Sequence, residues 1–442
     1  MNYRPPSSAL DLSRWRNVPL ALLLGGGAIS LLGFFACGQE FPYAWLLAFM
    51  FFLSLCLGAL FLVLVHHLFD AGWSVPIRRL CEHLASVLFP WMALLFLPLA
   101  LLAKKLYAWM SVDPHLDRAL AAKQPLFTAP AFYLVSGACF LVWWALTHRL
   151  RYWSLRQDET GGAQPTYRLR VYSAVGIFLF ALTLTLAAIL WMKALQYQWF
   201  STMYGVYYFA GSVWMTLATV YLITLALDRQ GTLTEVLGAQ QYYFLGSLLL
   251  AFTVFYAYIH FSQYFIIWNG NLPEETWWYV AREKGTWWWI GLIIIFGHFL
   301  VPFLALLRID VKSKFSLMVP LCVWAWIMHW FDLAFNILPV AHPTGFPVRW
   351  LWLQAGCGAF MGGLLALVFT KMFARHAPFP IKDPRLVEAM GLHHPGPLPP
   401  GVQPPAPPSR AQSAAAATGA QAASPPFFAD AEAPPQFRGG LR

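Results

Sequence analysis

Ten long apolar runs recur along this sequence, and their length constrains the fold more than any other feature. Each run is long enough to cross about 30 Å of hydrocarbon as an α-helix. None shows the apolar–polar alternation that a membrane-spanning barrel strand needs. The runs cover residues 18–36, 43–69, 84–110, 129–149, 170–192, 205–228, 241–268, 287–308, 315–339 and 348–373. The sequence therefore predicts an all-α polytopic membrane protein with about ten transmembrane helices.

The composition supports a membrane protein and argues against two other classes. Hydrophobic residues make up 59% of the 442 residues and charged residues only 11%, which is too few to cover a soluble surface of this size. The formal net charge of +10 comes with no basic cluster and no known binding module, so no nucleic-acid partner is expected. The six cysteines are scattered without a CxxC or CxxCH pair. We therefore predict no metal site, no haem and no disulfide framework in this chain.

The distribution of Lys and Arg predicts how the chain crosses the membrane. An even number of spans puts both termini on one side, and 21 of the 29 basic residues fall on that side. Because basic residues collect in cytoplasmic loops, we expect both termini to be cytoplasmic. The chain then divides into a cytoplasmic N-terminal segment (1–16), a membrane domain (17–373), a cytoplasmic extension (374–394) and a Pro/Ala-rich low-complexity tail (395–442).

Polar side chains gather inside the apolar runs of the second half of the chain. The stretch WIMHWFDLAFN puts His329, Asp332 and Asn336 on one helical face, because residues three, four and seven apart lie together. An Asp deep in a membrane costs about 2.5–3.5 kcal/mol on insertion scales, so it should face the interior of the bundle. The preceding spans add further candidates, on a shared face at Tyr256, His260, Gln263 and Tyr264 and singly at His298.

These groups have two interpretations. In one, they form a pocket that binds a quinone or moves a proton, since an imidazole can hydrogen-bond a quinone oxygen and a carboxylate can accept the released proton. In the other, they only hydrogen-bond to neighbouring helices, which suits an isolated histidine such as His298 best.

The first half of the chain offers weaker candidates at helix ends. His66, His67 and Asp70 close the second run and His148 closes the fourth, all near the expected cytoplasmic surface. We expect solvated helix ends there, with proton entry as the alternative role. A haem held by two of these histidines is disfavoured because they would lie too near water.

The segment Asn269–Gly285 is predicted to be an outer loop that contacts a partner. It carries Glu274 and Glu275 and has six tryptophans in or beside it, among them Trp277 and Trp278. Tryptophan is costly to expose to water and common in protein interfaces. We therefore expect these four side chains to form a docking surface.

Several stretches resemble one family of membrane proteins. They are AGWSVPIRR (71–79), LWMKALQYQWFSTMYGVYYFAG (190–211), HFSQYFIIWNGNLPEET (260–276), FGHFLVPFLALL (296–307) and KDPRLVEA (382–389). Together they resemble the ActF family of NrfD-like membrane subunits in bacterial alternative complex III, a quinol:cytochrome c oxidoreductase. The resemblance covers residues 15–392, and its most specific part is the loop signature QYFIIWNGNLPEET.

The resemblance implies an architecture, partners and a location. It implies two four-helix bundles, at 43–192 and 205–339, flanked by the first and last helices. It also implies a chain of the bacterial inner membrane that supports quinol oxidation without binding haem or metal itself, with menaquinol as the candidate ligand. Haem c and iron–sulfur clusters would belong to partner subunits of the ActA, ActB, ActC, ActD and ActE type. Lipids would surround the chain, and cytochrome c or an oxidase would accept the electrons.

The chain departs from the family pattern in one place. The family has an acid at the position of Leu190, and an acidic residue, Pro and His at the positions of Gln196, Tyr197 and Gln198. A proton-carrying role at that end of the fifth span is therefore not expected here. The polar groups of the seventh to ninth spans would have to supply it.

Two other functions stay open at this point. The chain could be a purely structural membrane anchor of the complex, with buried polar groups that only pack. It could also be a secondary transporter, a class that often has paired helix breaks near the midplane. The main candidates for such breaks, Pro90, Pro98 and Pro302, form no matched pair in the two halves.

Overall fold

A computed structural model of the chain describes residues 12, 15–234 and 236–390, and in these residues the only regular secondary structure is helical. Ten helices in the described part are long and apolar enough to cross a membrane, which confirms the predicted fold class. They are Asn17–Ala36 (α1), Phe41–Leu68 (α2), Gly72–Leu101 (ending in α4), Ala129–Thr160 (α7), Ala163–Gln196 (beginning with α8), Tyr204–Arg229 (α9), Ala239–Gly270 (α10), Thr286–Leu307 (α12 and α13), Phe315–Val340 (beginning with α14) and Val348–Phe373 (mostly α15).

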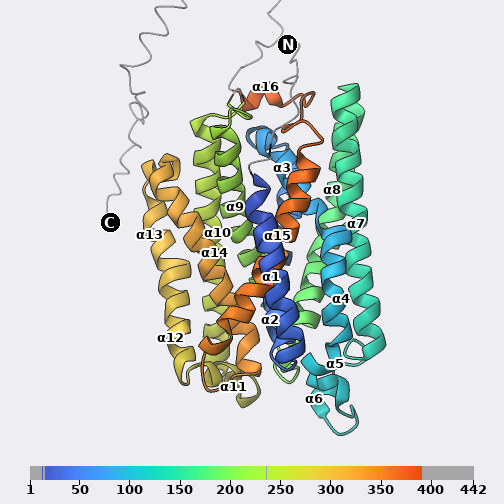
Figure 1. Cartoon of the computed structure of the whole chain (residues 1–442), viewed down its shortest axis with the longest axis vertical. Coiled ribbons are helices and arrows are strands. Elements are labelled where there is room, and N and C mark those ends of the chain that lie inside the picture. The colour runs from blue at the N-terminus through green and yellow to red at the C-terminus, as the bar shows by residue number, and fades with distance from the viewer. Residues whose placement is uncertain (1–11, 13–14, 235, 391–442) are drawn as a thin grey trace, which may run out of the picture. The chain divides into compact units, whose positions relative to one another are not determined.

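The other α-helices either lie at the two ends of the molecule or are the α-helical parts of the spans given above. They are Val75–Ser86 (α3), Ala93–Leu101 (α4), Ala103–Leu106 (α5), Arg118–Ala121 (α6), Ala163–Ala187 (α8), Pro273–Arg282 (α11), Thr286–Ile293 (α12), Val301–Leu307 (α13), Phe315–Ile337 (α14), Leu351–Phe373 (α15) and Leu386–Ala389 (α16). Figure 1 shows α16 at one end of the helices and α11, α5 and α6 at the other. We name these ends the α16 end and the α11 end.

The centre of the molecule is formed by α2 and α9, which pack against each other and are the most buried of the spans. On one side α2 packs against α3, α4 and α8, and α8 packs against α7. On the other side α9 packs against α10 and α14, and α10 packs against α13. The first and last spans, α1 and α15, lie side by side across this centre (Figure 1).

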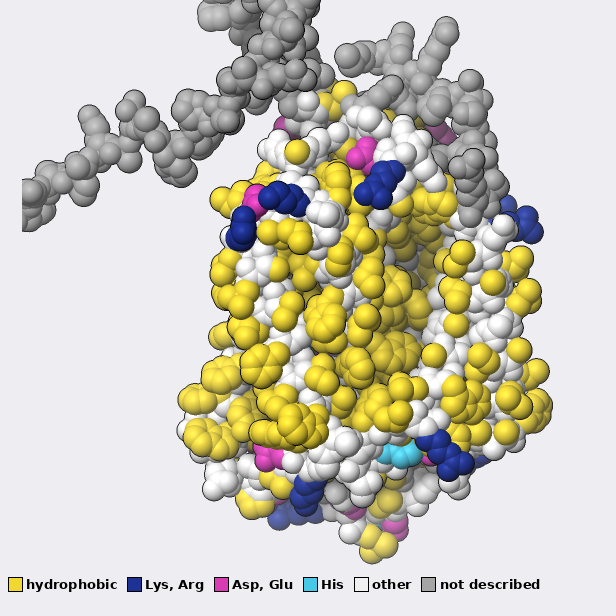
Figure 2. Space-filling view, turned by 60° about the vertical axis from the view of Figure 1, so that its left-hand side comes forward, with side chains coloured by type: hydrophobic (Ala, Val, Ile, Leu, Met, Phe, Trp, Pro, Cys, Tyr) yellow, Lys and Arg dark blue, Asp and Glu magenta, His cyan; other side chains and the backbone are white. Residues whose placement is uncertain are grey.

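The outer surface has the pattern that a bilayer requires. Figure 2 shows a broad hydrophobic band along the helices, with Lys, Arg, Asp and Glu confined to the two ends. Exposed large apolar side chains include Phe35, Phe178 and Leu134. A soluble protein would have to cover such side chains, whereas lipid solvates them.

Two predicted span boundaries were wrong for physical reasons. The third span begins at Gly72 rather than residue 84, because Arg78, Arg79 and Glu82 are buried inside the protein and paired there. The fourth span continues to Thr160, and Gly161 then reverses the chain with a φ of 64°. The segment expected as a loop is thus a helical hairpin that extends past the apolar band.

Three spans are interrupted by π-type turns, at Leu88–Met92, Ala188–Met192 and Ile294–Leu300. In the first, Phe89 has a non-helical φ of −137° and ψ of 133°, so the helix breaks before α4. The third contains His298. Single π-turns in helices are often found at functional sites, because they turn a side chain out of the regular register.

The structure describes the predicted domains to different extents. Most of the N-terminal segment (1–16) and all of the Pro/Ala-rich tail (395–442) lie outside the described residues. The extension is described to residue 390 and carries the short helix α16.

The close crossing of α1 and α15 depends on glycine. A Cβ atom at Gly26 would come within 2.3 Å of the Phe360 backbone nitrogen, whereas one at the neighbouring Gly25 would meet nothing within 4 Å. Small residues allow helices to approach closely in lipid. We predict that Gly26→Val lowers the melting temperature of the purified protein, since overpacking costs about 1–3 kcal/mol. Gly25→Val is the control, and equal effects of the two variants would contradict this account.

Candidate functional site

Asp332 is the centre of a buried polar cluster in the second half of the chain. Its Oδ1 accepts a hydrogen bond from the Tyr256 hydroxyl of α10 at 2.6 Å and a second one from the Tyr207 hydroxyl of α9. Asn336, one turn further along α14, donates to the Tyr207 oxygen at 2.9 Å and accepts from Tyr204 at 3.1 Å. The side chain of Asp332 is 2% exposed and forms no ion pair within the described part of the chain. Hydroxyl donors from two other helices therefore solvate this carboxylate in place of water.

His329 connects this cluster to the first half of the chain. Its Nε2 lies 2.9 Å from the Ser54 hydroxyl of α2, and that hydroxyl donates its only hydrogen to the Phe51 carbonyl at 2.7 Å. Nε2 must therefore donate, which leaves Nδ1 of a neutral His329 as a bare acceptor inside the protein. His329 and Asp332 share a helical face as predicted. Ligand atoms of the two side chains lie within 4.8 Å of each other, and Asp332 is hydrogen-bonded to the two tyrosines and not directly to His329.

His298 lies between two aromatic rings in the π-type turn of the eighth span. Its ring centroid is 3.9 Å from that of Trp214 and 3.8 Å from that of Tyr256. Both ring nitrogens are buried without a hydrogen-bond partner. A buried polar atom without a partner costs about 1–3 kcal/mol, so its retention calls for an explanation other than packing.

One set of three side chains in the described residues could hold a metal ion. Ligand atoms of His298, His329 and Asp332 all lie within 4.8 Å of one another. The fit is poor, because Asp332 Oδ1 already accepts two hydroxyls and His329 Nε2 is tied to Ser54. A divalent cation there would also add two positive charges beside one carboxylate in hydrocarbon. The arrangement suits a proton better than a metal.

A lipid-facing groove of about 770 Å³ reaches this cluster from outside. It lies between α10 and the eighth span, near α11, and most of its lining is aliphatic or aromatic. Its polar side chains include Tyr256, His260, Tyr264, Tyr279, Arg282 and Glu283. Lining residues such as Phe261 and Ile295 are 62% and 50% exposed, so the groove opens on the surface that lipid would cover.

His260 is a polar group of this groove without a hydrogen-bond partner among the described residues. It forms no hydrogen bond with any described residue, and its ring stacks on Tyr256 at 5.8 Å with an interplanar angle of 8°. Inward from Tyr256, the next polar group is the carboxylate of Asp332, which accepts a hydrogen bond from the Tyr256 hydroxyl. From the lipid face inward, the groove is therefore followed by His260, by the Tyr256 ring that His260 contacts, and by Asp332, to which Tyr256 is hydrogen-bonded.

Arg282 closes the groove at its α11 end. Its guanidinium donates to the backbone carbonyls of Phe335, Trp278 and Asn336 and to Gln196 Oε1, at 2.9–3.3 Å. It also lies 3.4 Å from the centroid of the Trp278 ring. Burial, with no carboxylate bonded to it, lowers the pKa of Arg282 to about 9. This buried cation holds α11 against α14.

The outer loop differs from the prediction. Residues Pro273–Arg282 form a helix, and Trp278 is only 4% exposed, stacked on Trp199 at 4.5 Å. The expectation that Trp278 would be exposed to a partner was therefore wrong, because its ring packs against Trp199 and Arg282 inside the protein. Trp277 and Glu275 are half-buried and Glu274 is exposed, so docking by these side chains stays a prediction.

The remaining candidates of α10, Gln263 and Tyr264, contribute to the α11 end of the site in different ways. Gln263 accepts from Ser201 at 2.7 Å and donates to the Tyr279 hydroxyl at 2.9 Å, so it positions α11 and does not contact the Asp332 cluster. Burial raises the pKa of Tyr279. Tyr264 packs edge-on against Tyr279 and lines the groove.

The candidates at the α16 end divide into two groups. His66 and His67 are 3% and 0% exposed, so the expected solvated helix end is wrong for them. His66 is bonded to Ser74 at 2.6 Å, and neither nitrogen of His67 has a partner. Asp70 and His148 are exposed, as predicted.

The burial of these histidines comes from an ion-pair network that sequence reasoning missed. Arg78 pairs with Glu82 at 3.1 Å and with Asp383, which lies 305 residues further along the chain. Arg385 pairs with Asp383 at 2.9 Å and with Asp70 at 3.1 Å. Two of the stretches that carry the family resemblance, 71–79 and 382–389, are thus in direct contact. The family resemblance of both stretches was the only sequence signal that could have indicated the pairing of Arg78 with Asp383.

Comparison with known proteins adds no further constraint. The sequence matches no protein-family model and no curated protein.

Asp383 supplies a pH-dependent contribution to stability. Burial acts to raise the pKa of its carboxyl, but Arg78 and Arg385 outweigh burial and hold the pKa well below its usual range. A depressed pKa contributes stability above the unfolded-state pKa of about 3.9, and this stability is lost as the pH falls through the folded-state pKa. We predict that Asp383→Asn costs about 3–5 kcal/mol of unfolding free energy at neutral pH.

The measurement is denaturant unfolding of both proteins from pH 8 to pH 3. The gap between wild type and Asp383→Asn should stay constant down to about pH 4 and then shrink. Asp310→Asn, which removes an exposed partner of Arg308 and Lys314, is the control and should change unfolding little. A gap that widens at low pH would contradict the assignment.

Proposed function

We propose that this chain is a membrane subunit of a quinol-oxidising electron-transfer complex, and that its second bundle binds the quinol and receives its protons. The proposal is supported by the succession of groups from the lipid-facing groove inward: His260, the Tyr256 ring that it contacts, and Asp332, to which Tyr256 is hydrogen-bonded. The resemblance to the NrfD-like subunits of alternative complex III points to the same class of complex.

The groove suits the chemistry of a quinol. Ligand pockets commonly measure about 300–1,000 Å³ and are mainly apolar with a few polar groups, and this one measures about 770 Å³. Its aromatic lining offers flat surfaces to a ring, and its opening toward lipid admits an isoprenoid tail. His260, which has no internal partner, would hydrogen-bond the headgroup oxygen.

The polar path suits the release of protons. Oxidation of a quinol to a quinone releases two electrons and two protons. His260 would take a proton from the headgroup hydroxyl, and the Tyr256 hydroxyl and Asp332 would pass it inward. The electrons would leave to haem and iron–sulfur centres of partner subunits. His329 and His298, with unpartnered nitrogens near Asp332, would be the next proton acceptors.

The proposal includes an orientation. We place the chain in a bacterial inner membrane with the α16 end cytoplasmic and the α11 end outside, because 21 of the 29 basic residues fall on the side of the termini. The groove then opens in the outer leaflet, and partner subunits with redox centres would sit against α11.

Activity of the intact complex tests the proposed site. Asp332→Asn keeps the shape of the side chain and removes the titrating group, so quinol-driven turnover should fall about 100-fold. Gly291→Phe places a ring in the groove from a glycine with only ordinary contacts, the nearest at 3.7 Å from Phe335. It should raise the KM for quinol by about tenfold, the equivalent of about 1.4 kcal/mol.

The control is Gly137→Phe, which fills a groove on the opposite half of the molecule and should leave quinol turnover unchanged. All variants must retain their partner subunits and haem content. If Asp332→Asn and Gly291→Phe assemble and turn over quinol as wild type does, the chain is a structural anchor and the proposal fails.

Thiol labelling tests the orientation. In a Cys37→Ser background the other five cysteines are buried, so a new cysteine supplies the only accessible thiol among the described residues. With an impermeant reagent on spheroplasts, Asn271→Cys should react, and Glu159→Cys should react only after permeabilisation. The reverse pattern would invert the orientation.

A further inference from the structure

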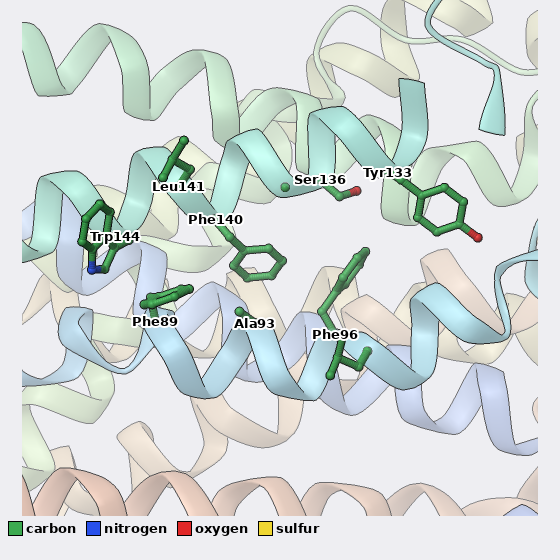
Figure 3. Close-up of a pocket in the computed structure, with 10 residues that line it drawn as sticks. Phe89, Ala93, Phe96, Tyr133, Ser136, Phe140, Leu141 and Trp144 are labelled. Carbon is green, nitrogen blue, oxygen red and sulfur yellow. The ribbon is translucent and has the colours of Figure 1, made fainter. Parts of the chain in front are cut away.

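A second groove, of about 560 Å³, lies between α4 and α7 on the lipid-facing side of the first half of the membrane domain. Figure 3 shows Phe89 and Phe96 from one side and Phe140 and Trp144 from the other, with Tyr133 toward the far end. Lining residues from one end to the other are exposed, with Trp144 at 42%, Leu141 at 60% and Tyr133 at 45%, so the groove is open along its length to whatever surrounds the protein.

The lining offers almost nothing to a polar ligand. The Tyr133 hydroxyl donates to the Ala100 carbonyl at 3.1 Å, and the Ser136 hydroxyl accepts from the Trp191 indole at 2.8 Å. The indole N–H of Trp144 forms no hydrogen bond with any described residue. A quinol headgroup has two oxygens that need partners, so this groove is built for a hydrocarbon occupant.

The groove is long and lined by apolar side chains. From Tyr133 to Trp144 it follows eleven residues of α7, or about 17 Å at about 1.5 Å per residue. This length is close to one leaflet, half of about 30 Å, and therefore suits an extended acyl chain.

Positive charge lies beyond one end of the groove. His148 and Arg151 follow Trp144 by four and seven residues on the same face of α7, and the His148 ring stacks on Trp144 at 5.8 Å. Arg151 forms no ion pair or hydrogen bond with any described residue. The nearby acids form ion pairs with other arginines: Glu82 pairs with Arg78 and Arg79, and Asp158 pairs with Arg79.

Two further histidines, His83 of α3 and His376 after α15, lie close enough to Arg151 to be affected by its charge. His83 is fully buried with neither ring nitrogen bonded, and its centroid lies 5.4 Å from that of His376. The pKa of His376 is lowered, first by burial and further by the charges of Arg151 and Arg79. A phosphate at this place would supply the anion that the described residues do not.

We propose that this groove binds an anionic phospholipid, with one acyl chain between α4 and α7 and the phosphate held by Arg151 and His148. The lipid fills the space that the helix break at Phe89 opens beside α7. The proposal is independent of the quinol site, which lies in the other half of the membrane domain.

Native mass spectrometry of the intact complex tests the proposal. Delipidated complex is incubated with dioleoyl phosphatidylglycerol or dioleoyl phosphatidylcholine, and bound lipid is counted after a detergent wash. Wild type should retain phosphatidylglycerol about fivefold better, the preference expected for one basic side chain at a membrane surface. Gly137→Phe, at a position where an added Cβ would meet no atom within 4 Å, should remove most of the bound lipid of either kind.

Arg151→Gln separates the headgroup from the chain. It should keep the lipid in the groove but make the two lipids bind alike. Gly291→Phe, in the quinol groove, is the control and should leave lipid retention unchanged. The proposal is overturned if Gly137→Phe retains lipid as wild type does, if wild type shows no headgroup preference, or if Gly137→Phe loses a partner subunit while lipid retention is unchanged.

Discussion

The hydrogen bonds from Tyr207 and Tyr256 to Asp332 are the interaction on which the membrane site depends. A carboxylate in hydrocarbon has no water, so its donors must come from other helices and must be held in place. These two hydroxyls fix α9 and α10 against α14 at one depth. They also place the Asp332 carboxylate directly behind Tyr256, which lines the groove that opens toward lipid.

The two ends of the molecule hold this arrangement with different chemistry. At the α16 end, Arg78 and Asp383 form a buried pair that ties the extension after α15 to α3. At the α11 end, Arg282 uses carbonyl oxygens and an aromatic face in place of an acid. One end is thus a network of opposite charges, and the other keeps a single buried cation beside the proposed quinol groove. Such a cation would favour an electron-rich or anionic headgroup nearby.

Sequence reasoning succeeded where helical periodicity or apolar length carried the information. Ten spans follow from run length, and the shared face of His329, Asp332 and Asn336 follows from their spacing. The partners of Asp332 could not be predicted, because Tyr207 and Tyr256 belong to other helices and contacts between helices leave no periodic mark. The start of the third span was misplaced for a related reason: Arg78 is neutralised by Asp383, 305 residues away, and Arg79 by Asp158, 79 residues away. Trp278 was misjudged because a local count of tryptophans does not show which ring stacks on a neighbour.

The central claim is that a quinol headgroup binds between α10 and the eighth span, against His260. The most direct measurement is a density map of the intact complex prepared with its native quinone or a tight-binding quinol analogue. The account predicts a ring in this groove with an oxygen at hydrogen-bond distance from His260 and with its tail leading to the lipid face. A groove filled only by lipid, with the headgroup density confined to another subunit, would contradict it.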